Sequence, residues 1–235
     1  MSSTQANVPV IDNELDLLAE LLALPGLRIV ELGCGAAALA RALLLRHPDC
    51  QVTGVEVDAR QHGKNLAAPQ SGLQFVAGVA QDMAFPDRSF DLALMLKSLH
   101  HVPVQAQEQA LNEVARVLRP GGHLYVSEPV YDGEFNALAR LYNDEGVVRA
   151  AAQSALDATL RTGLWRQRAV RRFVMPVHFK DFADFEQRMM RPTYADHQLD
   201  EAKIDQVRKA FMPYQGPQGA SFQRPMHARL LEKTR

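Results

Sequence analysis

Two glycines and a carboxylate in the first quarter of the chain have the spacing of a nucleoside-binding site. Gly33 and Gly35 follow a short apolar stretch, and glycine lets a backbone turn tightly and come close to a ligand. Glu56 stands about 20 residues further on, at the end of a second apolar stretch, where a carboxylate can bind both hydroxyls of a ribose. Together these residues predict a nucleoside ligand.

Glu31 helps to distinguish between two kinds of nucleoside ligand. The glycine bend, residues 33–37, also suits a dinucleotide, because Gly33, Gly35 and Ala38 satisfy the relaxed form of the dinucleotide fingerprint. A carboxylate buried just ahead of the bend is costly unless it has a partner, and the ammonium of a methionine group would be one, directly or through water. The alternative is that backbone N–H groups of the bend bind Glu31.

A second group of ionisable residues, 97–101, reads Lys-Ser-Leu-His-His and follows a later apolar stretch. Histidine titrates near neutral pH, so His100 and His101 are candidates for a catalytic base or a substrate ligand. The alternative is that one or both bind the backbone and shape the loop.

The elements that must position these residues follow from the hydrophobic pattern. Helical spacing begins after Asn13, a capping residue type, and ends at Pro25-Gly26. Short strands then alternate with helices, which predicts right-handed crossovers and a mostly parallel sheet that binds ligands at the carboxyl ends of its strands. The predicted strands are 27–32, 51–57, 73–76, 90–95 and 123–127, and the predicted helices are 37–46 and 107–118, the second ended by Arg-Pro-Gly-Gly at 119–122.

The pattern changes from about Tyr131 onward, where a mainly helical segment, 135–168, replaces the alternation. The expected fold is α/β, doubly wound, with a mostly parallel seven-stranded sheet and a mainly helical cap insertion. Later expected elements are a strand at 170–179, a short helix at 182–190 and a last strand at 226–232. The expected domains are an arm and helix, 1–25; a cofactor-binding core, 26–130; a cap with the substrate region, 131–197; and a C-terminal strand that completes the sheet, 198–235.

Residues 27–129 resemble the class I S-adenosylmethionine-dependent methyltransferases that are similar to the ubiquinone and menaquinone C-methylating enzymes, the methyltransferase domain 11 group. Five blocks carry the resemblance in the right order: VELGCG, VTGVEVD, FPDRSFDLAL, LHHV and EVARVLRPGGHLYVSEP. It implies S-adenosylmethionine as the cofactor, S-adenosylhomocysteine as its product, and a loop at 97–101 near the transferring methyl group.

The resemblance also implies roles for single residues. Glu31 and the glycines hold the methionine and ribose parts, Glu56 binds the ribose hydroxyls and Val57 packs near the adenine. The full expected cofactor set is Glu31, Gly33, Cys34, Gly35, Glu56, Val57, Ala80, Gln81 and Lys97.

Two residues depart from the family pattern. Ala37 replaces the third glycine of the bend, which is tolerable if its φ is negative. Val79 stands where the family usually has an acid that reads the adenine amino group, so the Ala80 N–H, Gln81 or Asp82 would have to serve instead.

The composition narrows the partners. With 235 residues and a net charge of −1, the chain has no surplus of basic residues for nucleic acid. Two cysteines, Cys34 and Cys50, make no disulfide framework, and no Cys/His cluster predicts a metal. No apolar run predicts a membrane span or a signal peptide, so a cytoplasmic protein is expected, and an oligomer is left open.

The expected function is methyl transfer to a small-molecule acceptor by direct displacement from the sulfonium. A basic stretch around Arg171 makes an anionic acceptor one option. A catalytically silent binding module is the first alternative. A nicotinamide-dependent oxidoreductase is the second, although no tyrosine has a lysine four residues on. The expected acceptor-binding residues are Tyr131, Tyr142, Arg171 and His178.

Overall fold

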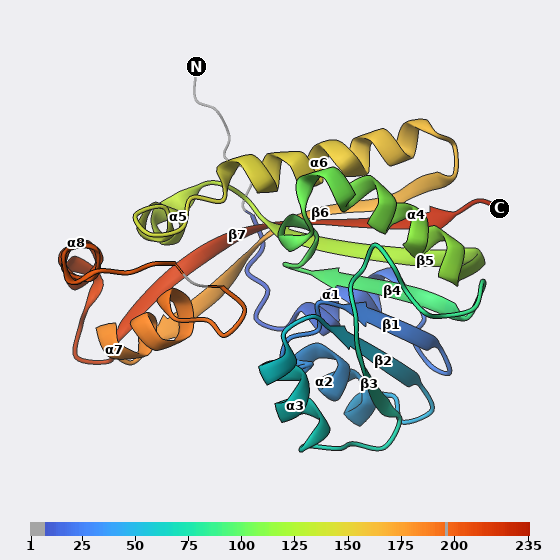
Figure 1. Ribbon diagram of the computed structural model, residues 1–235, viewed down its shortest axis with the longest axis horizontal. Coiled ribbons are helices and arrows are strands. Elements are labelled where there is room, and N and C mark those ends of the chain that lie inside the picture. The colour runs from blue at the N-terminus through green and yellow to red at the C-terminus, as the bar shows by residue number, and fades with distance from the viewer. Residues whose placement is uncertain (1–7, 196) are drawn as a thin grey trace. The chain divides into compact units, whose positions relative to one another are not determined.

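The computed structural model describes residues 8–195 and 197–235, and a seven-stranded sheet is its main feature (Figure 1). The strand order is β3-β2-β1-β4-β5-β7-β6, and the four pairings from β3 to β5 are parallel. The predicted doubly wound, mostly parallel α/β fold is therefore confirmed. The strands are β1 (Arg28–Leu32), β2 (Gln51–Glu56), β3 (Leu73–Ala77), β4 (Phe90–Leu96), β5 (Leu118–Pro129), β6 (Trp165–Phe179) and β7 (Ala220–Lys233).

Eight α-helices and several shorter turns connect these strands within the described residues. Much of the predicted arm falls on residues 1–7, outside that part of the chain. No helix in residues 8–195 and 197–235 combines the length and the hydrophobicity needed to cross a bilayer. The helices are α1 (Glu14–Leu21), α2 (Ala38–Arg46), α3 (Ala59–Leu66), α4 (Gln107–Val117), α5 (Gly133–Ala139), α6 (Gly146–Arg161), α7 (Phe182–Phe185) and α8 (Glu201–Phe211), with 3-10 turns Leu99–His101, Val104–Ala106 and Met212–Tyr214 and a π turn Glu186–Met190.

The strand order explains where a ligand can reach the sheet. After β3 the chain crosses back over β2 and β1 and enters β4 on the far side of β1, so the direction of winding changes between β1 and β4. Ligands of open α/β sheets bind outside the carboxyl ends of the strands at this point. Residues from α4 and α6 pack on one sheet face, with Val30, Ala93 and Val126 beneath them.

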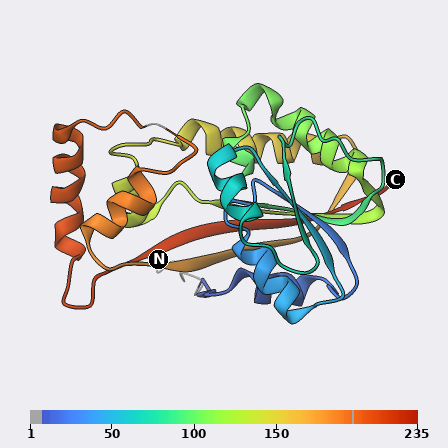
Figure 2. The same cartoon turned by 60° about the horizontal axis from the view of Figure 1, so that its bottom comes forward.

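Two compact units divide the chain. The core unit holds residues 13–128, 148–171 and 228–235, and the second unit holds the described residues up to 12, together with 129–147 and 172–227. This grouping differs from the expected boundaries, because most of α6 belongs with the core and α8 belongs with α5 and α7. Figure 2 gives a second view of the elements of each unit.

Several elements differ from the sequence prediction. The Arg-Pro-Gly-Gly segment ends α4 but also starts β5, where it forms a bulge: Phe90 pairs with Leu118 and Leu92 with His123, so residues 119–122 are extra on the β5 side. β6 begins at Trp165, inside the segment predicted to be helical.

The helix α8 was not predicted in the C-terminal region. Asp200 caps it by accepting a hydrogen bond from the Lys203 N–H at 2.7 Å, and Ile204, Val207 and Phe211 follow at helical spacing on its buried side. The cap and the spacing were both readable in the sequence.

Candidate functional site

The glycine bend, residues 33–37, joins β1 to α2 at the carboxyl end of β1. Gly33, Gly35 and Ala37 have left-handed conformations, with φ of 65°, 53° and 54°. A Cβ at Gly33 would lie 2.8 Å from the Cβ of Ser98, so only glycine fits there. The condition of a negative φ at Ala37 is therefore not met. A left-handed conformation costs an alanine more free energy than it costs a glycine.

Glu56, the last residue of β2, holds the bend against the next strand. One carboxylate oxygen accepts a hydrogen bond from the Gly35 N–H at 2.7 Å, and the other accepts one from the Asp58 N–H at 2.9 Å. The side chain is buried. Because a carboxylate has about four lone-pair positions, it can still accept two hydroxyl donors from a ligand.

Asn65 supports the bend from α3, and the sequence prediction missed it. Its side-chain N–H₂ donates to the Gly35 carbonyl at 2.7 Å and also faces the Cys34 sulfur at 3.8 Å. Asn65 is buried in a helix that is otherwise polar, so its sequence looks the same as that of a solvent-exposed asparagine.

Glu31 is buried on β1, and the bend does not satisfy its carboxylate. The N–H groups of residues 33–35 donate elsewhere, to the Val55 carbonyl and to Glu56. Within the described residues, one Glu31 oxygen has no hydrogen-bond partner. Burial raises the pKa of Glu31 to about 8, against the opposing attraction of the Lys97 ammonium. The N–H groups of residues 33–35 therefore do not bind Glu31, and the Ala40 N–H in the first turn of α2 is a backbone group that opposes the rise in its pKa.

Lys97 and Ser98 bring further polar groups to the bend from the end of β4. Lys97 has a φ of 55°, and its N–H donates to the Ser127 carbonyl at 2.7 Å. Its ammonium lies 3.5 Å from the carboxylate of Glu14. The Ser98 hydroxyl is buried and has no hydrogen-bond partner among the residues described. Left-handed residues of this kind gather at functional sites more than elsewhere.

His100 and Glu128 form a buried pair in the core unit. The Nδ1 of His100 meets one Glu128 oxygen, and the other oxygen accepts the Leu99 N–H at 2.9 Å. An ionised carboxylate can only accept a hydrogen bond, so Nδ1 carries the proton wherever Glu128 is ionised. His101 is exposed, and its ring centroid lies 4.0 Å from that of His100. Glu128 was not predicted.

The turn 79–82 follows β3 and has no acid at its first position. The Asp82 N–H donates to the Val79 carbonyl at 3.4 Å, and Gln109 of α4 donates to the Gln81 carbonyl at 2.9 Å. Ala80 and Gln81 are half-buried. Val57, expected beside the adenine, is 66% exposed and therefore open to an aromatic ligand.

Arg116 fixes the chain that follows this turn. Its guanidinium donates to the carbonyls of Met83 and Phe85, at 2.8 and 2.7 Å, and pairs with Glu113 at 2.8 Å. Glu113 in turn accepts the Met83 N–H at 3.2 Å. Residues 81–85 are thus held by α4.

The four residues expected to bind the acceptor do not gather within one unit. Tyr131, Tyr142 and His178 belong to the second unit and Arg171 to the core unit. Each has a contact of its own: the Tyr131 hydroxyl with Asp144 at 2.6 Å, the Tyr142 ring with the Phe185 ring at 6.3 Å between centroids, His178 Nδ1 with the Ser221 hydroxyl at 3.1 Å, and the Arg171 guanidinium with the Val170 carbonyl at 3.0 Å.

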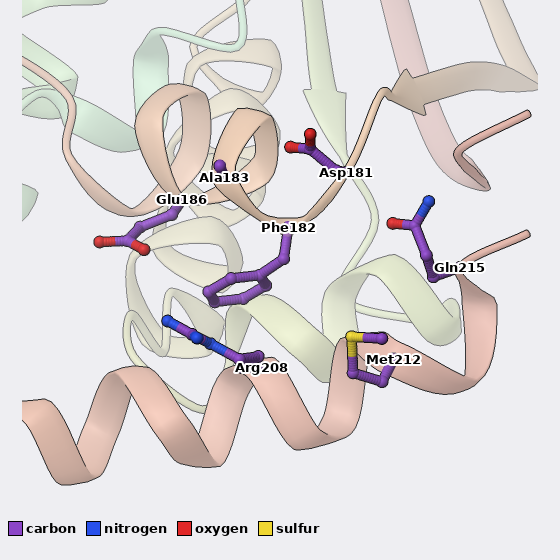
Figure 3. Close-up of a pocket in the computed structure, with 7 residues that line it drawn as sticks. All are labelled: Asp181, Phe182, Ala183, Glu186, Arg208, Met212 and Gln215. Atoms are coloured by element: carbon purple, nitrogen blue, oxygen red, sulfur yellow. The ribbon is translucent and has the colours of Figure 1, made fainter.

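A cavity of about 360 Å³ lies in the second unit, between α7 and α8 (Figure 3). None of the four expected residues lines it. Arg208 stacks on Phe182, its guanidinium carbon 4.9 Å from the ring centroid. The lining residues are Asp181, Phe182, Ala183, Glu186, Arg208, Met212 and Gln215.

Part of the core unit is similar to a known protein family. Residues 30–126 match the family model described as a methyltransferase domain. A fatty-acid O-methyltransferase of Mycolicibacterium smegmatis is 39% identical over 116 residues, which are 46% of this chain and 39% of that protein. A sterol 24-C-methyltransferase of Gibberella zeae is 33% identical over 119 residues, 47% of this chain and 30% of that protein. The chain therefore spans less than half the length of these relatives.

A solved structure supports the same fold over more of the chain. The YcgJ protein of Bacillus subtilis superposes with a TM-score of 0.65 and 20% identity, covering 94% of this chain and 98% of that one. At this identity the likeness concerns the fold alone. The glycine bend at the end of β1 lies inside the matched segment, and residues 30–126 are thus similar to a methyltransferase domain.

Proposed function

We propose that this protein transfers a methyl group from S-adenosylmethionine to a small-molecule acceptor by direct displacement. One observation carries the proposal beyond the family match: the buried carboxylate of Glu31 has an oxygen without a partner beside the glycine bend. A buried carboxylate of this kind is costly, and a ligand cation would remove that cost.

The residues of the site fit the cofactor part by part. Glu31 would bind the ammonium of the methionine end. Glu56 would bind the ribose hydroxyls with the lone pairs that its two backbone contacts leave over. The backbone of Gly33, Cys34 and Gly35 would pass beneath the ligand. When bound, S-adenosylmethionine supplies an electrophilic methyl group on a positively charged sulfur.

The adenine would lie between exposed Val57 and the turn 79–82. Val79 offers no acceptor to the adenine amino group, so the recognition falls to the Ala80 N–H and the Gln81 side chain. The contacts of α4 with the chain after Gln81 keep that backbone in place.

His100 is proposed as the base that deprotonates the acceptor, positioned by Glu128. Glu128 fixes the ring by holding Nδ1, which leaves proton uptake to Nε2. Such a base is useful for a hydroxyl acceptor and dispensable for one that is already ionised. The two relatives methylate oxygen and carbon by name, and they match this chain over 116 and 119 residues. The presence of His100 as a base therefore favours a hydroxyl oxygen as the acceptor atom. His101, the exposed neighbour, would contact the acceptor.

An anionic acceptor remains part of the proposal through Arg171. This side chain is exposed and is bonded only to the neighbouring Val170 carbonyl among the described contacts, so its remaining donors can face a carboxylate or phosphate. Arg171→Gln should raise the KM for an anionic acceptor and leave the KM for S-adenosylmethionine unchanged. An equal KM for the acceptor in both proteins would remove Arg171 from the site.

The deciding experiment is turnover to S-adenosylhomocysteine across a panel of small hydroxyl, carboxyl, amine and thiol acceptors. Turnover with at least one acceptor supports the proposal. Tight binding of S-adenosylmethionine without any turnover would favour the silent binding module, and binding of a nicotinamide cofactor in its place would favour an oxidoreductase. Calorimetric titration with both cofactors separates these outcomes.

The role of His100 has its own test once a hydroxyl acceptor is known. Glu128→Gln leaves an acceptor oxygen for Nδ1 but removes the charge that stabilises the protonated ring. We expect the pH at which kcat/KM reaches half its maximum to shift and kcat to fall by about 10²-fold. His100→Asn should remove the pH dependence itself. An unchanged pH profile in both variants would show that the pair only shapes the loop.

A further inference from the structure

Glu14, the first residue of α1, is a buried carboxylate of the core unit that the proposed cofactor contacts do not use. One oxygen accepts a hydrogen bond from the Tyr125 hydroxyl at 3.0 Å, and the other lies 3.5 Å from the Lys97 ammonium. Tyr125 is fully buried, and the backbone of Lys97 is fixed through its bond to the Ser127 carbonyl. The position of this carboxylate is therefore defined on two sides.

The sheet register places Glu14 near Glu31. Glu31 of β1 pairs with Leu94 of β4, and Leu94 pairs with Tyr125 of β5. Residues paired across neighbouring strands point to the same face, and neighbouring strands are about 4.8 Å apart. Glu31 and Tyr125 thus stand on one face, about 10 Å apart at their Cα atoms. Glu14 meets this row from α1, at its Tyr125 end.

The charges in this row do not balance. Two buried carboxylates, Glu14 and Glu31, share a single ammonium, that of Lys97. Lys97 forms its ion pair with Glu14, and among residues 8–195 and 197–235 no ion pair joins Lys97 to Glu31. When Glu31 ionises, its negative charge is therefore left for a cation from outside the chain.

We propose that Glu14 is a positioning residue for cofactor binding: together with Tyr125 it holds the Lys97 ammonium away from Glu31, so that Glu31 remains available to the ammonium of S-adenosylmethionine. This inference rests on the proposed function and extends the site to α1. Without Glu14, Lys97 would turn to the nearest remaining carboxylate and compete with the ligand for it.

The same charge count couples cofactor binding to a proton. Lys97, Glu14, Glu56 and Cys34 are the ionisable groups that act on Glu31 or are acted on by it, from the loop after β4, α1, β2 and the bend. Their sum leaves Glu31 protonated at neutral pH, because burial raises its pKa to about 8. A ligand ammonium would displace that proton, so binding should release about one proton at pH 7.

The test is calorimetric titration of the full chain with S-adenosylhomocysteine, in a double-mutant cycle of Glu14→Gln and Lys97→Met. Glutamine keeps an oxygen for the Tyr125 hydroxyl but gives up the charge. With Lys97 present, Glu14→Gln should weaken the binding of S-adenosylhomocysteine about tenfold or more. A charge contact within 4 Å in a partly buried position is strong enough to account for a loss of this size. With methionine at position 97, the same change should cost less than about twofold.

Two controls separate this mechanism from a loss of structure. Glu20→Gln makes the same change on an exposed position of α1 and should leave the affinity unchanged. 5′-Methylthioadenosine lacks the ammonium, so its affinity should not depend on residue 14. If Glu14→Gln does not fold, as judged by circular dichroism, Tyr125→Phe replaces it, with a loss of about threefold expected only while Lys97 is present.

The outcomes distinguish the two proposals. If the unaltered protein does not bind S-adenosylhomocysteine, the proposed function fails. If the protein binds it and Glu14→Gln binds equally well, or loses the same factor with methionine at position 97, the role of Glu14 is overturned while the function stands. Titrations in buffers of different ionisation enthalpy measure the proton release, which should be absent in Glu31→Gln.

Discussion

The glycine bend of the core unit and the aromatic cluster of the second unit differ in the free-energy costs that their residues carry. The cluster consists of Phe135, Tyr142, Phe179, Phe182, Phe185 and Phe211. Around the glycine bend several residues reduce the stability of the fold. Ala37 and Lys97 have left-handed conformations, and the carboxylates of Glu14 and Glu31 are buried. Such costs persist only where a ligand or the surrounding structure compensates for them. This is the pattern of a site whose structure serves binding rather than stability.

The residues of the aromatic cluster carry no comparable free-energy cost. Phe185 is fully buried, and its ring lies within 6.5 Å of five others, with centroid distances from 5.1 to 6.5 Å. Arginines cover its rim, for example Arg188 over the ring of Phe179 at 4.7 Å. The comparison indicates that this cluster stabilises the second unit, whereas the costs at the bend fit the proposed role in ligand binding. Four changes test that division.

Phe185→Ala should have the largest effect, and on stability alone. Removing a fully buried phenylalanine costs about 3–5 kcal/mol, so the urea midpoint measured by far-ultraviolet circular dichroism should fall. Trp165, the single tryptophan, is buried in the core unit, and its fluorescence transition should move less. Val147→Ala, at a 79% exposed position of the second unit, should stay within about 0.5 kcal/mol of the wild type. Equal shifts by both probes would mean that the two units unfold as one.

Glu56→Ala should have the converse effect, on binding more than on stability. The change removes the acceptor of the Gly35 and Asp58 N–H groups and the proposed ribose contact. Affinity for S-adenosylhomocysteine should fall about 100-fold, which corresponds to about 2.7 kcal/mol. Gln51→Ala, at the exposed start of the same strand, is the matched control. A loss below about threefold would mean that Glu56 only shapes the bend.

The same division explains what the sequence could predict. The bend and Glu56 leave a readable pattern, because left-handed turns select glycine and buried carboxylates are rare. The seven-stranded fold was predicted for a similar reason, since alternating short apolar runs and helical spacing allow few topologies. The aromatic cluster leaves no such pattern, because phenylalanine at helical spacing packs a core wherever it occurs.

The rest of the site was missed for physical reasons. Glu128 and His100 are 28 positions apart and meet only because β4 and β5 are neighbours. Asn65 is buried in a polar helix, where sequence alone suggests exposure. The condition set for Ala37, a negative φ, is not met, because tertiary contacts can hold a residue against its local preference. The residues expected to bind the acceptor are predicted from their amino-acid type alone. The type of a residue does not show to which unit it belongs.

Glu31→Gln should separate stability from binding by pH. In the folded protein Glu31 keeps its proton up to about pH 8, whereas in the unfolded chain it loses it near 4.5. Between these values the folded state binds more protons, so this group makes the wild type less stable as pH rises, by about 1.4 kcal/mol per pH unit. Glutamine does not ionise. The variant should therefore be the more stable protein at pH 8.5, with little difference near pH 4.5.

Urea unfolding of both proteins at several pH values measures this difference. Affinity for S-adenosylhomocysteine should change in the opposite direction, weakening about tenfold or more in Glu31→Gln. A variant that is less stable at pH 8.5 would show that the carboxylate is satisfied in the free protein, and the observation that carries the proposed function would be lost.

Ala37→Gly is the smallest change and tests whether the bend stores strain. Ala37 has a φ of 54°, a conformation that costs an alanine about 1–2 kcal/mol and a glycine almost nothing. Part of that gain is offset, because glycine has more freedom in the unfolded chain, by about 0.4–1 kcal/mol. A net increase of about 1 kcal/mol or less in the free energy of unfolding should remain. Ala42→Gly, inside the helix α2 that follows the bend, should instead lower it by about 1 kcal/mol. Opposite signs for two identical substitutions five residues apart would assign the cost to the bend itself, and equal signs would show that Ala37 carries no strain.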